Sequence, residues 1–111
     1  MGINQLNFYT NSQGHNPLTY AAAIGNFEAV NYLTARGMLI DVEDREGKTV
    51  LTRTLAAEKY DLVNKLIARG ADINSVNREG RTALSLFLLQ SKIGVVEFLL
   101  RLGANPHVED L

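Results

Sequence analysis

The chain has 111 residues, is 46% hydrophobic and 21% charged, and carries a formal net charge of −1. These values suit one globular domain and exclude a strong general attraction to nucleic acid or anionic membranes. The sequence has no cysteine, which excludes disulfides and thiolate metal sites and agrees with a reducing compartment. It contains no apolar run long enough to cross a membrane and no N-terminal signal-peptide pattern.

Glycine recurs at a fixed period of 33 residues. One set is Gly14, Gly47 and Gly80, and the other is Gly37, Gly70 and Gly103. A fixed period in this range is the signature of a stacked-repeat architecture. We therefore interpret residues 1–111 as a single domain with a leader at 1–10 and repeats at 11–43, 44–76 and 77–111, the third including the C-terminal end.

The first repeat predicts two short helices. Asn16 can cap a helix through its side-chain oxygen, and Pro17 suits the first helical position. We expect this helix over 18–24, with Gly25 ending it in a left-handed conformation. A second helix is expected over 27–36, and its apolar stripe is Ala29, Val30 and Leu33.

The second repeat has the same order of turn, helix, turn and helix. Thr49 is the expected cap of a helix over 51–57. A second helix over 61–69 is expected to bury Leu62, Val63, Leu66 and Ile67. Glu58 stands where the first repeat has Gly25, and a left-handed backbone would cost a residue with a side chain about 1–2 kcal/mol. We therefore expect the helix before Glu58 to run on or to end differently.

The third repeat begins its first helix, over 84–90, after Thr82 and Ala83, and Ser91 replaces the stop glycine. Its second helix has an apolar stripe of Val95, Val96, Leu99 and Leu100. One helix pair cannot bury both of its faces alone, so we expect three stacked pairs to share a continuous core.

These motifs resemble the ankyrin repeat over about residues 11–109. Gly47-Lys48-Thr49 and Gly80-Arg81-Thr82 match its opening, Pro17-Leu18 and Ala21-Ala22 its middle, and Gly70-Ala71-Asp72-Ile73-Asn74 its closing segment. The resemblance implies an all-α solenoid of stacked helix-turn-helix repeats joined by projecting β-turns. It also implies an intracellular module, cytoplasmic or nuclear, that binds a protein or peptide on the concave surface formed by the turns and first helices.

No group of residues converges on a catalytic, cofactor or metal site. His15 and His107 lie in repeats at opposite ends of the predicted stack, and we interpret both as solvated turn residues. The serines lack a glycine-rich elbow, and the turn glycines are single rather than arranged as a phosphate-binding loop. We therefore expect no enzymatic activity, no cofactor and no metal.

Charged residues recur in register in the turns of the second and third repeats. The rows are Arg45 with Arg78, Glu46 with Glu79, and Lys48 with Arg81. We interpret them as an edge that meets an acidic or polar stretch of a partner, because arginine can bind carboxylates with two parallel hydrogen bonds. The floor of the adjacent groove would be Ala23, Ile24, Ala56, Ala57, Leu89 and Gln90. The alternative is a solvated surface with weak local ion pairs.

Leu86 and Phe98 stand where the second repeat has Arg53 and Lys65. Charged side chains are rarely buried without a partner, so Arg53 and Lys65 should reach water and their apolar counterparts should be partly exposed. Leu89 lies three residues after Leu86 and can share its helix face. We therefore predict an apolar patch in the third repeat that binds a partner or forms a homo-oligomer.

Two alternatives remain at this stage. Phe87 and Leu88 could separate the helices of the third repeat, so that Leu86 and Phe98 fill the gap. In function, the main hypothesis is a non-catalytic protein-interaction module. The alternative is a self-associating structural unit, or a fragment of a longer solenoid, that uses the apolar third repeat.

Overall fold

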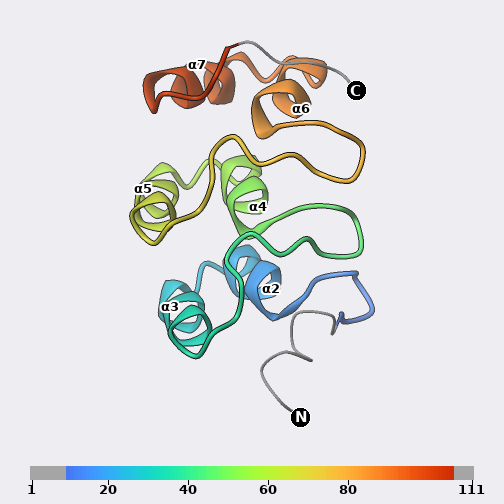
Figure 1. The fold of residues 1–111 in the computed structure, drawn as a ribbon, viewed down its shortest axis with the longest axis vertical. Coiled ribbons are helices and arrows are strands. Elements are labelled where there is room, and N and C mark those ends of the chain that lie inside the picture. The colour runs from blue at the N-terminus through green and yellow to red at the C-terminus, as the bar shows by residue number, and fades with distance from the viewer. Residues whose placement is uncertain (1–9, 107–111) are drawn as a thin grey trace. The chain divides into compact units, whose positions relative to one another are not determined.

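The computed structural model describes residues 10–106, and in this range the regular structure is helical, with no strand (Figure 1). This confirms the predicted all-α fold. The helices, which alternate with turns, are α2 (Pro17–Ala23), α3 (Phe27–Ala35), α4 (Val50–Ala56), α5 (Tyr60–Ala68), α6 (Ala83–Leu89) and α7 (Ile93–Arg101).

The chain divides into two compact units, Met1–Ala71 and Asp72–Leu111. Unit 1 contains the helix pairs α2/α3 and α4/α5, and α2 packs against α4. Unit 2 contains the pair α6/α7, whose helices pack against each other. The boundaries of the leader and of the three repeats within 1–111 stay a prediction.

The first helix of each pair begins at a side-chain cap, which the sequence predicted for Asn16 and Thr49. The Asn16 side chain accepts a hydrogen bond from the Thr19 backbone N–H at 2.8 Å, and the Asn16 N–H donates to the Thr19 hydroxyl at 2.9 Å. Thr49 and Thr82 cap α4 and α6 through their hydroxyl oxygens. Each cap satisfies a backbone donor that has no partner within the helix, so the start of each helix is determined locally.

The first helix of each pair also ends in the same way, although the residues differ. Gly25, Glu58 and Ser91 have φ values of +74°, +56° and +56°. The expectation that the helix before Glu58 would run on or end differently was therefore wrong, since α4 ends at Ala56 as α2 ends at Ala23.

The reason lies in the hydrogen bonds that close this turn. The N–H groups of Glu58 and Lys59 donate to Leu55 and Thr54 at 3.0 and 3.2 Å, as those of Gly25 and Asn26 do to Ala22 and Ala21 at 3.0 and 2.8 Å. These closing bonds, together with the packing of the next helix, outweigh the strain of a left-handed residue with a side chain.

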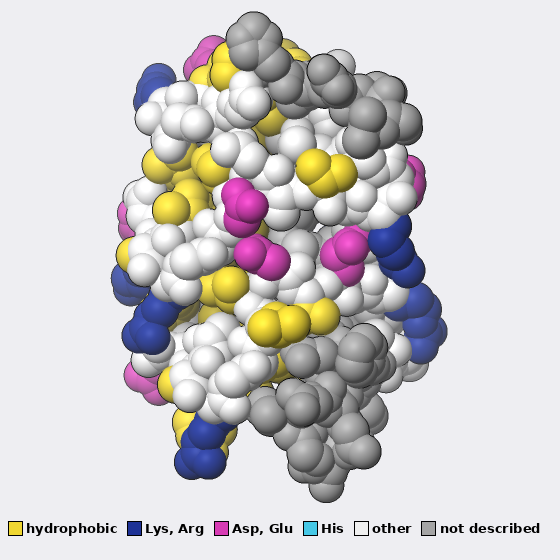
Figure 2. Space-filling model, in the orientation of Figure 1, with side chains coloured by type: hydrophobic (Ala, Val, Ile, Leu, Met, Phe, Trp, Pro, Cys, Tyr) yellow, Lys and Arg dark blue, Asp and Glu magenta, His cyan; other side chains and the backbone are white. Residues whose placement is uncertain are grey.

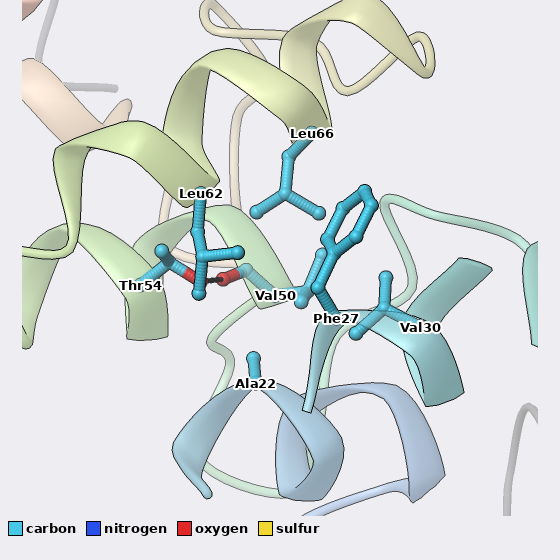
Figure 3. Close-up of a pocket in the computed structure, with 7 residues that line it drawn as sticks. All are labelled: Ala22, Phe27, Val30, Val50, Thr54, Leu62 and Leu66. Carbon is cyan, nitrogen blue, oxygen red and sulfur yellow. Dashed lines mark hydrogen bonds between the residues drawn. The ribbon is translucent and has the colours of Figure 1, made fainter. Parts of the chain in front are cut away.

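Side chains from all four helices meet in the core of unit 1 (Figure 3). They are Ala22, Phe27 and Val30 from the first pair, and Val50, Thr54, Leu62 and Leu66 from the second. The Thr54 hydroxyl donates to the Val50 carbonyl at 2.7 Å, so its polar atom has a partner within α4. A gap of about 10 Å³ remains between these side chains, and its lining is apolar.

The predicted burial of the second helices was right at the centre of each stripe and wrong at its margins. Val63, Leu66, Val95, Val96 and Leu99 are buried. In contrast, Leu62 and Ile67 are half-buried, and Leu100 is 44% exposed. Successive residues are about 100° apart around a helix, so these three lie at the edges of the buried face.

We expect Gly70→Ala to destabilise unit 1 by about 1 kcal/mol, because Gly70 has φ +100° and a side chain there is strained. No atom lies within 4 Å of where the new Cβ would be, so the penalty is conformational rather than steric. Chemical denaturation of the variant measures the change in the free energy of unfolding.

The matched control is Gly94→Ala, because Gly94 lies within α7 and its Cβ would also meet open space. This substitution should stabilise by roughly 0.4–1 kcal/mol. Effects of the same sign and size at the two glycines would contradict the assignment.

Glu58→Gly should stabilise the chain by about 0.5–1 kcal/mol, because relief of left-handed strain exceeds the extra flexibility of an unfolded glycine. Thermal and urea unfolding both test this. Glu28→Gly, in the first turn of α3, is the matched substitution and should destabilise. A loss of stability of equal size in both variants would show that the strain at Glu58 is negligible.

Candidate functional site

Each projecting turn is built around one side chain that accepts two backbone hydrogen bonds. Asp44 Oδ1 accepts from the N–H groups of Glu46 and Lys48, at 2.9 and 3.0 Å. Asn11 and Asn77 make the same pair of bonds in the other two turns. This arrangement satisfies donors that would otherwise face solvent, and it holds the charged side chains of the turn on a defined loop.

In the second repeat the same residue also forms an ion pair that the sequence reasoning did not anticipate. Asp44 Oδ2 accepts from Nε and Nη2 of Arg53 at 3.0 and 2.8 Å. The Asp44 side chain is fully buried, whereas that of Arg53 is 17% exposed. Arg53 therefore reaches water only in part, and the reason is a partner that lies within its own repeat.

Glu46 completes this ion-pair group. Its Oε1 accepts from Arg53 Nη2 at 3.0 Å. Burial by itself lowers the pKa of Arg53, but hydrogen bonds and charge attraction from Asp44 and Glu46 outweigh it, so the Arg53 pKa is raised above its usual value. The guanidinium therefore stays charged at any working pH and fastens the turn to α4.

A comparison of equivalent positions in the three repeats contains a signal for this ion pair. At the Asp44 position they have Asn11 and Asn77, and at the Arg53 position they have Tyr20 and Leu86. An amide can make the two turn bonds, but its nitrogen cannot accept from arginine. The acid and the base thus occur together in the second repeat and are both absent from the other two. This joint occurrence predicts a pair, but it is overlooked when each position is considered alone.

Of the remaining charged residues of the turn at 44–48, Arg45 and Glu46 are exposed and Lys48 is half-buried. Figure 2 shows lysine and arginine side chains along the edge of unit 1 where Figure 1 draws the turn before α4. Arg45 is exposed and its Nη2 donates to the Thr10 hydroxyl at 2.8 Å, while its backbone N–H donates to Gly14 at 2.9 Å. The predicted residues Arg45, Glu46 and Lys48 therefore share one turn, which is hydrogen-bonded to the turn of the first repeat.

The turn of the third repeat, in unit 2, carries the other three predicted charged residues. Arg78 and Glu79 are exposed, and Arg81 is half-buried with its Nε 3.9 Å from a carboxylate oxygen of Glu79. This separation makes a loose ion pair that is worth little in water.

The first helices of unit 1 present the predicted apolar floor. Ala23, Ile24, Ala56 and Ala57 are exposed. Tyr20 is exposed as well and lies three and four residues before Ala23 and Ile24, on the same face of α2. Sequence reasoning missed Tyr20, although it occupies the position of Arg53 one repeat earlier.

The exposure of the predicted apolar residues of unit 2 agrees with the prediction. Leu86 and Phe98 are half-buried, which agrees with partial exposure, and Leu89 is 65% exposed. Lys65, the counterpart of Phe98, is exposed, with its Nζ 5.2 Å from the centre of the Phe27 ring. Sequence reasoning did not identify a second set of exposed apolar residues in this unit, which are Leu88, Ile93 and Leu100.

His15 is half-buried rather than fully solvated. Its ring lies 6.3 Å from that of Tyr20, and Nδ1 is buried without a hydrogen-bond partner in the described residues. His107 lies outside the described residues. Residues 10–106 contain no cluster of side chains suited to a metal ion, and no helix in this range has both the length and the apolar character needed to cross a membrane.

A double-mutant cycle on Asp44 and Arg53 tests the ion pair. Arg53→Leu leaves a buried carboxylate without its main counter-charge and should cost about 2 kcal/mol or more. Asp44→Asn keeps the two turn bonds and should cost about 1 kcal/mol. The double variant recreates the Asn77 and Leu86 pair of the third repeat and should lie within about 1 kcal/mol of the parent.

Urea denaturation of the four proteins gives the coupling energy between the two positions. Single effects that add up in the double variant would mean that the two side chains do not stabilise one another.

The comparison with protein families covers almost the whole chain. The family described as ankyrin repeats (3 copies) matches residues 2–77, and the family described as ankyrin repeat matches residues 79–111. No curated protein shows significant sequence similarity to the chain. Together with the helix pairs, the left-handed stop residues and the projecting turns, the two matches show that the chain belongs to the ankyrin repeat family.

Proposed function

We propose that the chain is a non-catalytic module that binds a segment of a partner protein across α2, α4 and the turn at 44–48. Ankyrin repeats are generally protein-interaction modules and are typically not catalytic. The observation that carries the proposal for this surface is the set of exposed apolar residues on α2 and α4, in the same unit as the turn that holds Arg45 and Lys48.

This set of residues is suited to a side chain inserted by a partner. The small side chains of Ala23, Ala56 and Ala57 leave space for a partner's side chain, while Tyr20 and Ile24 supply larger apolar surface. A tyrosine in such a position offers both apolar contact and a hydroxyl for hydrogen bonding. These side chains are exposed and so lie outside the core, and their grouping on the surface favours an interaction site.

The turn supplies the charge that selects the partner. Arg53 is occupied by Asp44 and Glu46, and Arg45 and Lys48 are the basic residues of this turn. We therefore propose a partner segment with an acidic or polar group beside an apolar side chain. Arg78, Glu79 and Arg81, with Leu86, Leu89 and Phe98, are proposed to offer the same combination in the third repeat.

The absence of catalysis, cofactors and metals in this chain belongs to the same proposal, as does an intracellular location, cytoplasmic or nuclear. Support comes from the family and from a sequence without cysteine.

Selection from a displayed peptide library with no charge bias tests the surface. Peptides enriched on the parent protein should combine acidic and apolar residues. Replacing Arg45, Lys48, Arg78 and Arg81 by serine should leave the fold intact and weaken binding of these peptides by at least about tenfold. Fluorescence titration measures the dissociation constants.

The control removes the same number of charges elsewhere, at the ends of the second helices and on α5. In this variant Arg36, Lys65, Arg69 and Lys92 become serine. It should bind the selected peptides as the parent does. Unaltered affinity in the turn variant, or equal losses in both variants, would remove the basic turns from the site.

A further inference from the structure

Three exposed apolar side chains of unit 2 form a face that the proposed function does not use. Leu88 of α6 is 44% exposed, and Ile93 and Leu100 of α7 are 56% and 44% exposed. We call these three residues the α6/α7 face. Large apolar residues grouped in this way are unusual on a surface that stays in water.

The 33-residue period identifies this face with one that is covered in unit 1. Two periods before Leu88 and Ile93 are Ala22 and Phe27, which pack against Val50, Thr54, Leu62 and Leu66 of α4 and α5 (Figure 3). The α6/α7 face thus has the position of a surface that receives another helix pair.

The residue types on this face strengthen the comparison. Leu88 replaces Ala22, and Leu100 replaces the half-buried Thr34, so these two positions are more apolar than in the first repeat. Leu89 belongs to a different surface, because its counterparts Ala23 and Ala56 are exposed in unit 1. The neighbouring leucines of α6 therefore differ in role although both reach water.

The charges beside the face indicate what covers it. Glu97 and Arg101 follow Ile93 by four and eight residues, on the same side of α7 as Leu100. Both are exposed, and neither forms an ion pair within residues 10–106. Because they have opposite charge and lie one turn apart, an antiparallel α7 from a second copy would place each beside its complement.

We propose that a second copy of this chain covers the α6/α7 face in a two-fold symmetric dimer. Leu88, Ile93 and Leu100 of each copy form the apolar centre, and Glu97 of one copy pairs with Arg101 of the other. The contact lies at these residues rather than at Leu86 and Phe98, which are half-buried. This interaction is separate from partner binding across α2 and α4, so either proposal can fail without the other.

Sedimentation equilibrium of the 111-residue chain over a wide concentration range tests the dimer. The parent should pass from monomer to dimer and no further, because a two-fold contact closes on itself. Leu88→Glu with Leu100→Glu should weaken the dimer at least about tenfold while circular dichroism shows a folded chain. Leu89→Glu, the same change at a more exposed position on the same helix, should leave the dimer unchanged.

Charge exchange tests the symmetry. Glu97→Arg and Arg101→Glu should each weaken the dimer, and the two changes together should restore it. If the double leucine variant unfolds, Ile93→Lys at the most exposed position replaces it. A parent that is monomeric at all concentrations, growth beyond the dimer, an equal effect of Leu89→Glu, or no restoration by charge exchange would overturn the proposal.

Discussion

The paired hydrogen bonds from the turn to the side chain of Asn11, Asp44 or Asn77 are the constraint on which the rest of the surface depends. A projecting loop has no sheet or helix to satisfy its backbone donors, so one side-chain oxygen replaces that partner. The fixed loop then leads directly into a capped helix. Turn, cap and first helix therefore form one continuous element, and the charged residues between them have defined positions.

The second repeat adds charge to this shared arrangement. A carboxylate has a second oxygen that an amide lacks, and Asp44 uses it to hold Arg53. Removing water from a buried carboxylate costs free energy, and the attraction of the guanidinium offsets this cost. Both groups lie in one segment of ten residues, 44–53. The same guanidinium also pairs with the negative charge of Glu46, so one arginine serves both acidic residues of the turn.

Local sequence predicted the helix starts well, because the caps at Asn16, Thr49 and Thr82 act within one turn of their helices. It failed at Glu58, where closing hydrogen bonds and packing outweigh the preference of a single residue. Prediction of the Asp44–Arg53 pair would have required that two positions, each different from its equivalents in the other repeats, be considered together. The exposure of Leu88 and Leu100 could not be predicted from a helical stripe, since the burial of a repeat face depends on what packs against it.

The buried ion pair also gives the repeats different responses to heat. Hydration of charged groups becomes less favourable as temperature rises, so the cost of keeping Asp44 and Arg53 away from water falls. The neutral amides of Asn11 and Asn77 have no such compensation. On warming, the turn of the second repeat therefore retains its structure longest, and loosening of the projecting turns begins in the repeats on either side of it in the sequence.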